Sequence, residues 1–125
     1  MVGSLINGFD FDGVLYFGEQ HGCCLRPLPQ DVIITGRSFE HASFVYGKLR
    51  EIGIENAVYF NPRLIKDNDR IESGLHKART LKTLQDNGIR VVLFFEDDDI
   101  QKEQIEKWGP SETTVIHLVH GITKK

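Results

Sequence analysis

Residues 5–15, Leu-Ile-Asn-Gly-Phe-Asp-Phe-Asp-Gly-Val-Leu, form an apolar run that ends in two carboxylates, Asp10 and Asp12, with Gly13 directly after them. Residues two apart on a strand point to the same side, so both acids can turn into the space beyond a sheet edge. Two carboxylates this close repel each other unless a cation or a proton lies between them. The pattern predicts a hard metal ion, or a nucleophile beside an acid/base. The alternative is an ordinary acidic turn, since Asp and Gly are common in turns.

The overall composition is that of one globular domain spanning residues 1–125. The chain is 40% hydrophobic and 26% charged, with a net charge of −3, which gives no general drive toward nucleic acid or an anionic membrane. No apolar run approaches the ~20 residues that span a bilayer, and the first residues lack the basic start of a secretory signal. The adjacent Cys23 and Cys24 are expected to stay thiols, because neighbouring cysteines seldom bridge. Together these features predict a cytoplasmic protein without a membrane partner.

Strand-like and helix-like segments alternate along the chain. The expected strands are 5–11, 31–35, 57–60, 90–95 and 113–119, and the expected helices are 38–52, 74–87 and 100–108. Ser38 is the expected N-cap of the first helix. Alternation of this kind favours a three-layer α/β sandwich of the Rossmann-like class, with a mostly parallel central sheet of about five strands.

The polar residues follow the ends of the expected strands. Asp10 and Asp12 end the first strand, Thr35-Gly36-Arg37 the second, and the acids at 96–99 the fourth. Lys77 lies near the start of the helix before the fourth strand. Ligands of open parallel sheets bind beyond the carboxyl ends of the strands, so these groups are expected to meet at one edge.

In their order and residue types these segments resemble the four motifs of the haloacid dehalogenase (HAD) superfamily of phosphohydrolases. Asp10 to Leu15 matches the pattern Asp-x-Asp-Gly-x-Leu/Thr, and Val32 to Arg37 matches an apolar strand ending in Thr-Gly-Arg. Lys77 fits the lysine that precedes the fourth motif by roughly twenty residues, and Val91 to Asp98 fits that motif, an apolar strand ending in acids. The four matches together span most of the chain.

The resemblance implies a Mg²⁺-dependent phosphatase that works through an aspartyl-phosphate. Asp10 would be the nucleophile, and Asp12 would protonate the leaving oxygen and later activate water, with its main-chain carbonyl on the metal. Asp97 would bind magnesium directly, with Asp98 as a co-ligand or an outer partner. The implied metal set is therefore Asp10, Asp12, Asp97 and Asp98.

The resemblance also implies a phosphoryl-binding set. Thr35 would hydrogen-bond the phosphoryl group, with Gly36 and Arg37 beside it, since a guanidinium suits phosphate oxygens. Lys77 would neutralise the nucleophile and the phosphoryl oxygens. Lys66, in the loop after the third strand, is a rival for the role of Lys77, and Lys82 is a weaker one.

The acidic run 96–99 leaves open which two acids reach the metal. Glu96 stands where many relatives carry glycine, which favours Asp97, and Asp99 would then be the helix N-cap. A run of this kind also suits a helix N-terminus that uses acids to match its dipole.

The histidines show no metal-ligand spacing apart from one loose pair. His117 and His120 lie on the last expected strand, away from the motifs, and are predicted to be surface or packing residues; His21 and His41 show no metal-ligand spacing. His76 adjoins Lys77 and is a candidate for substrate contact.

Neither of the long connections, 14–30 and 61–73, has room for a folded cap domain. An open site would admit a bulky or macromolecular phosphate, or a second copy of the chain would cover it in a homo-oligomer. The fourth motif and the helix ending at Trp108 also resemble phosphatase domains of nucleic-acid end-repair enzymes, so a 3′-phosphatase is an alternative.

Two further alternatives belong to other classes of protein. One is a catalytically silent binding module that retains the fold. The other is a receiver-like domain, whose phosphoacceptor Asp would end the third strand; here that strand ends in Phe60-Asn61-Pro62.

Overall fold

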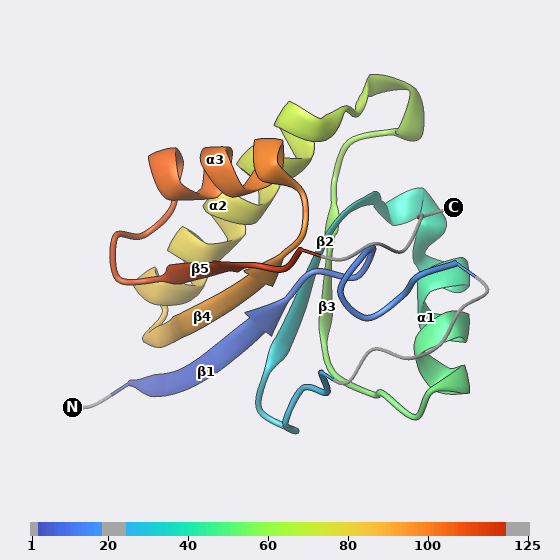
Figure 1. The fold of residues 1–125 in the computed structure, drawn as a ribbon, viewed down its shortest axis with the longest axis horizontal. Coiled ribbons are helices and arrows are strands. Elements are labelled where there is room, and N and C mark those ends of the chain that lie inside the picture. Colours follow the sequence, from blue (N-terminus) through green and yellow to red (C-terminus); the bar gives the residue numbers. More distant parts are fainter. Residues whose placement is uncertain (1–2, 19–24, 120–125) are drawn as a thin grey trace.

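A computed structural model describes residues 3–18 and 25–119 and contains one five-stranded sheet (Figure 1). The strands are β1 (Ser4–Phe9), β2 (Val32–Ser38), β3 (Val58–Asn61), β4 (Ile89–Glu96) and β5 (Thr114–His117). They are all parallel and lie in the order β3-β2-β1-β4-β5. The predicted α/β class is confirmed, with a wholly parallel sheet.

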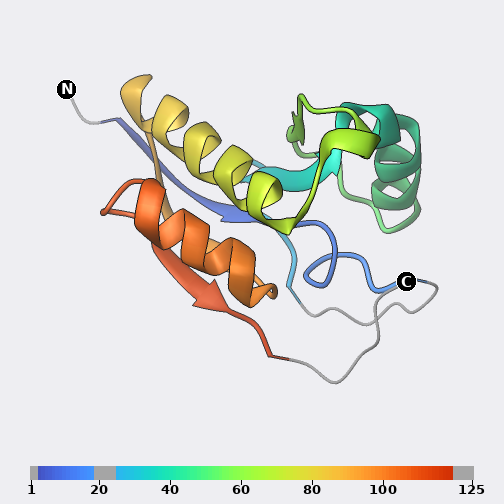
Figure 2. The same ribbon diagram turned by 90° about the horizontal axis from the view of Figure 1, so that it is seen from above.

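In the described residues, three α-helices connect β2 to β3, β3 to β4 and β4 to β5, and together they cover both faces of the sheet. They are α1 (Ala42–Glu51), α2 (Arg70–Asp86) and α3 (Asp99–Trp108), with single 3₁₀ turns at η1 (Phe39–His41) and η2 (Ile65–Asp67). Helices α2 and α3 pack beside each other on one face, and α1 lies apart from them (Figure 2). The result is a Rossmann-like three-layer sandwich, with the carboxyl ends of all the strands at one edge.

Two apolar clusters fill the space on either side of the sheet. Val91 and Phe94 of β4 pack with Leu81 and Ile105 of the helices α2 and α3. The ring of Phe95 points to the other face and stacks on Phe9 at 4.8 Å. A strand apolar on both faces is typical of a central position in a parallel sheet, as predicted for 90–95.

Element boundaries differ from the expectations at three places that matter for the site. Helix α2 begins at Arg70 because the side chain of Asp69 accepts a hydrogen bond from the amide of Glu72, so Lys77 lies in mid-helix. Strand β1 ends at Phe9, which leaves Asp10 and Asp12 beyond it. Strand β2 runs on to Ser38, so residues 35–37 lie inside a strand.

Ser38 caps the element that follows, as predicted. Its hydroxyl accepts a hydrogen bond from the amide of Glu40, and the capped element is the 3₁₀ turn η1. Within the described ranges, no helix combines the length and the hydropathy needed to cross a bilayer. The predictions made for His21, Cys23, Cys24 and His120 lie outside the described residues.

Candidate active site

The carboxyl ends of β1 and β4 bring three carboxylates together. One oxygen from each of Asp10, Glu96 and Asp97 lies within 4.8 Å of the others. Asp10 follows β1, Glu96 is the last residue of β4, and Asp97 comes next. Because neighbouring parallel strands end at the same edge, residues 86 positions apart in sequence become neighbours.

Lys77 of α2 reaches into this carboxylate cluster. Its ammonium lies 3.0 Å from Oδ1 of Asp10 and donates to Oε1 of Glu96 at 2.6 Å, with the lysine side chain 1% exposed. Burial disfavours the charged form, but the two carboxylates outweigh it and raise the pKa of Lys77. Lys66 and Lys82 are exposed, so Lys77 is the lysine that α2 directs to the cluster.

Asp10 is almost wholly buried, and its Oδ1 also accepts a hydrogen bond from the amide of Phe11 at 2.8 Å. Burial is the main cause that raises the pKa of Asp10 well above its usual range, and the charge of Glu96 adds to it. Lys77 opposes both. Any cation that joins the cluster therefore favours the ionised form of Asp10.

Glu96 has a structural part in the cluster that the sequence analysis missed. Its carboxylate is fully buried, and Oε2 accepts hydrogen bonds from the amides of Asp97 at 3.1 Å and Asp98 at 3.2 Å. With Oε1 on Lys77, both oxygens are engaged by the protein. Glu96 thus holds the lysine and the turn after β4. The signal in the sequence is an acid at the end of an unbroken apolar strand.

Asp97 is accommodated by the absence of a side chain at Gly13. A Cβ atom on Gly13 would overlap the carboxylate of Asp97, and Gly13 has a φ of +78°, which L-residues rarely adopt. The ring Nε2 of His117 lies 3.1 Å from the carbonyl oxygen of Asp97. The prediction that His117 lies away from the motifs is therefore wrong, because β5 pairs with β4 up to Glu96 and His117.

Asp98, expected to ligate or support the metal, does not join the three-carboxylate cluster. Its side chain caps α3 by accepting from the amides of Ile100 and Gln101, and it forms a two-pronged ion pair with Arg70 at 2.8 and 2.9 Å. Burial works against ionisation, but these hydrogen bonds lower the pKa of Asp98 to about 2. The prediction of Asp99 as the N-cap is wrong by one residue, since Asp99 is the first residue of α3.

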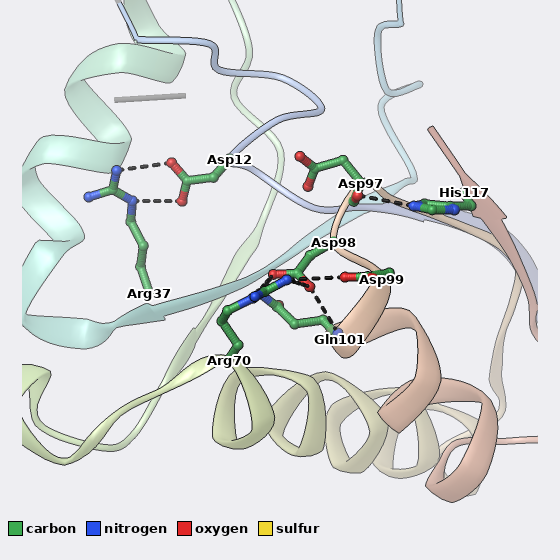
Figure 3. A pocket seen from close by; sticks show the side chains of 8 residues that line it. All are labelled: Asp12, Arg37, Arg70, Asp97, Asp98, Asp99, Gln101 and His117. Carbon is green, nitrogen blue, oxygen red and sulfur yellow. Dashed lines mark hydrogen bonds and ion pairs between the residues drawn. The ribbon is translucent and has the colours of Figure 1, made fainter. Parts of the chain in front are cut away.

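Asp12 faces Arg37 of β2 in an ion pair with two hydrogen bonds, drawn in Figure 3. Nε of Arg37 donates to Oδ2 at 2.8 Å and Nη2 donates to Oδ1 at 2.9 Å. Burial opposes the charged form, yet the bonds to Asp12 raise the pKa of Arg37. The guanidinium carbon also lies 4.9 Å from the ring centre of Phe44 and 5.8 Å from that of Phe11.

Thr35 and Gly36 are placed differently from each other. Thr35 is completely buried, and its hydroxyl accepts a hydrogen bond from the amide of Arg37. Gly36 lines a cavity instead, and its Cα faces Ser73, where a Cβ would come within 2.7 Å of the hydroxyl oxygen. The predicted phosphoryl contact of Thr35 therefore does not reach either cavity described below.

Two cavities meet at the carboxylate cluster. The inner one, about 150 Å³, contains Asp10 and Lys77 in a wall otherwise made of polar side chains and Gly36. The outer one, about 710 Å³, is lined by Asp12, Arg37, Arg70, Asp97, Asp98, Asp99, Gln101 and His117 (Figure 3). The inner volume suits a small anion, and the outer volume lies in the range of small-molecule sites.

The remaining predicted contact, His76, does not line either of these cavities. It is largely buried beneath β3, with Nε2 3.4 Å from the carbonyl oxygen of Tyr59. Burial lowers the pKa of His76 to about 4, so the ring is neutral at pH 7.

The cluster fits a hard divalent cation by the chemistry of its donors. Magnesium prefers carboxylate oxygens, and three converge here with Gly13 leaving room for one of them. Since both oxygens of Glu96 are engaged, Asp10 and Asp97 are the two side chains best suited to ligate it.

Comparison of the chain with protein-family models, with curated proteins and with solved structures finds no match.

Proposed function

We propose that this protein is a Mg²⁺-dependent phosphohydrolase that hydrolyses phosphomonoesters through an aspartyl-phosphate on Asp10. The observation that carries the proposal is the convergence of Asp10, Glu96 and Asp97 at the carboxyl edge of a parallel sheet, with the buried ammonium of Lys77 on Asp10 and Glu96. Residues that are far apart in the chain thus supply a nucleophile and a cation in the inner cavity, and a further metal ligand, Asp97, in the wall of the outer cavity.

In the first half of the reaction, the carboxylate of Asp10 attacks phosphorus and the bond to the leaving oxygen breaks. Lys77 offsets the charge of Asp10 and of the phosphoryl oxygens, and it is already oriented by Glu96, so little reorganisation is needed. Asp12, which first takes up a proton from solvent, gives that proton to the leaving oxygen. General acid help of this kind is typically worth ~10²–10⁴ in rate.

In the second half, water attacks the phosphorus of the aspartyl-phosphate while Asp12 takes a proton from the water. Inorganic phosphate leaves and the Asp10 carboxylate is restored. Asp10, Asp97 and the main-chain carbonyl of Asp12 would hold the magnesium ion, which would supply the positive charge that lets an anionic nucleophile meet an anionic ester.

The outer cavity supports a substrate larger than the phosphoryl group alone. At about 710 Å³ it is large enough for a small-molecule leaving group, and the inner cavity beside Asp10 and Lys77 would take the phosphoryl group. A nucleic-acid end bearing a 3′-phosphate remains an alternative substrate.

The test is phosphate release from a broad panel of phosphoesters with magnesium present. The panel includes sugar phosphates, mononucleotides and oligonucleotides ending in a 3′-phosphate. We expect turnover by the wild type and a loss of roughly 10³-fold or more in Asp10→Asn, which has nearly the same shape but cannot form the phosphoenzyme. Asp67→Asn, which removes an exposed carboxylate on η2, is the matched control and should retain activity.

An inert wild type with magnesium present would count against the proposal. Magnesium binding without turnover on any ester would favour a catalytically silent binding module. Preference for 3′-phosphorylated oligonucleotides over mononucleotides would identify the end-repair alternative.

A further inference from the structure

The ion pair between Asp12 and Arg37 stands at the boundary of the two cavities. Both residues line the inner cavity and the outer cavity. A phosphoryl group entering the inner cavity therefore meets a guanidinium whose parallel pair of donors, on Nε and Nη2, is already occupied by a carboxylate.

Arg37 is held by contacts that do not depend on Asp12. The guanidinium lies over the ring of Phe44 at 4.9 Å, and Nη1 is 3.3 Å from Nδ1 of His41. These contacts with the aromatic face and with His41 restrict the guanidinium and leave its Nε–Nη2 edge available to an anion. Of the two partners in the ion pair, Arg37 is the fixed one.

Asp12 is held less firmly. It lies three residues beyond the end of β1, and its carboxylate is 30% exposed. Within residues 3–18 and 25–119, Arg37 is the residue that donates hydrogen bonds to both side-chain oxygens of Asp12. The side chain can leave Arg37 by rotation once another anion takes its place.

The geometry points to an anion exchange at Arg37: the phosphoryl group of the substrate replaces the carboxylate of Asp12 on the guanidinium and thereby releases Asp12 toward the leaving oxygen. Arg37 is then a substrate-binding residue that also positions the acid/base. A guanidinium offers the same two parallel donors to a phosphate as to a carboxylate, so the exchange conserves its hydrogen bonds. This inference rests on the proposed function for the role of Asp12, but the exchange itself is measurable without turnover.

The experiment measures binding of inorganic phosphate by calorimetry at a fixed magnesium concentration, in a double-mutant cycle. Asp12 competes with phosphate for Arg37, so Asp12→Asn should raise phosphate affinity several-fold, by roughly tenfold if both hydrogen bonds are at stake. In the Arg37→Gln background the same Asp12→Asn change should leave affinity nearly unaltered. Asp99→Asn removes an equal charge from the wall of the outer cavity without touching Arg37, and its effect should be the same in both backgrounds.

A second readout follows the guanidinium directly. The ¹⁵N resonance of Arg37 Nε should shift on phosphate addition in the wild type, and the shift should be smaller in Asp12→Asn, where the starting partner is already altered. Arg37→Lys keeps the charge but loses the paired donors, and should bind phosphate roughly tenfold more weakly.

The exchange is refuted if Asp12→Asn raises phosphate affinity equally with and without Arg37, or if phosphate does not bind or leaves Arg37 Nε unmoved. If the enzyme is active but the effects of Asp12→Asn and Arg37→Gln on phosphate affinity are additive, this inference alone is overturned. A protein that shows the coupling but hydrolyses no ester would leave the exchange standing and refute the proposed function.

Discussion

The ammonium of Lys77 lies 3.0 Å from Oδ1 of Asp10, and both side chains are almost wholly withdrawn from water. Neither charge would be stable there alone, because burial of an unpaired charge costs several kcal/mol. Their pairing, with Glu96 as the second carboxylate, makes this cluster a determinant of stability as well as the centre of the proposed chemistry.

Replacement of Lys77 by methionine should destabilise the fold markedly. The change leaves the buried carboxylates of Asp10 and Glu96 without their cation, at a cost of about 3–5 kcal/mol. Urea denaturation measures the loss in the free energy of unfolding. The control is Lys82→Met, at an exposed position on the same helix, whose free energy of unfolding should stay within about 0.5 kcal/mol of the wild type. Equal stability of the two variants would contradict the buried ion-pair network.

Asp97 and Glu96 should differ in their effect on metal binding. Asp97→Asn removes a proposed ligand and should weaken binding of Mn²⁺, used as a spectroscopic substitute for magnesium, by at least roughly tenfold. Glu96→Gln should act chiefly on stability, since both oxygens of Glu96 are engaged by Lys77 and two amides. Electron paramagnetic resonance of free Mn²⁺ gives the affinities without any need for turnover, and a larger loss in Glu96→Gln would reverse the assignment.

Gly13→Ala should lower both stability and metal affinity. The substitution strains a backbone with a φ of +78°, at about 1–2 kcal/mol, and its methyl group would displace the carboxylate of Asp97. Gly53→Ala is a matched control, because Gly53 has a φ of +75° while a Cβ there meets nothing closer than 3.5 Å. Thermal unfolding should respond to both variants, and Mn²⁺ affinity to Gly13→Ala alone.

Asp98 should act as a helix cap. Asp98→Ala removes the acceptor for two amides of α3 and the partner of Arg70. It should lower the free energy of unfolding by about 0.5–2 kcal/mol. Asp99→Ala, one position along and exposed, should cost less than about 0.5 kcal/mol. If chemical denaturation gives the same loss for both, the cap assignment is wrong.

The stability of the protein should fall between pH 6.5 and pH 4 because of His76. Its pKa is about 4 in the folded chain, against 6.5 for the unfolded chain, so the unfolded state binds the extra proton in this window. The contribution of the neutral His76 ring to the free energy of unfolding is fully present above pH 6.5. It is fully lost below pH 4, and the loss amounts to roughly 3 kcal/mol. Equilibrium unfolding as a function of pH should show a shallower slope in His76→Gln. Thr80→Val, which removes a neighbouring hydroxyl and keeps the imidazole, should leave the slope in place.

Hydrophobic patterning was a good guide to the elements of this fold and a poorer guide to their ends. The apolar run at 90–95 and the helical spacing around Leu81 and Leu84 predicted β4 and α2, because the periods of strand and helix are set by backbone geometry. The start of α2 was missed by four residues. Its true cap, Asp69, lies in a polar stretch without apolar periodicity, and the cap depends on one side-chain hydrogen bond.

The acids after β4 were likewise predicted in part and missed in part. The sequence predicted that they would gather opposite Asp10, and Asp97 does so. It did not predict that Glu96 would join them and Asp98 turn away. Alternation along β4 places Glu96 on the same side as the buried Phe94, facing Lys77, and the unpaired amides of α3 take Asp98.

The amino-acid sequence by itself determined the class of fold and the edge of the sheet at which polar groups gather, because parallel strands joined by helices must all end on one side. Only the tertiary structure decided the pairings: Lys77 with Asp10 and Glu96, and Arg37 with Asp12. Pairings of this kind depend on distances of about 3 Å between side chains from different elements, and such distances are set by how helices pack on the sheet rather than by any local pattern along the chain.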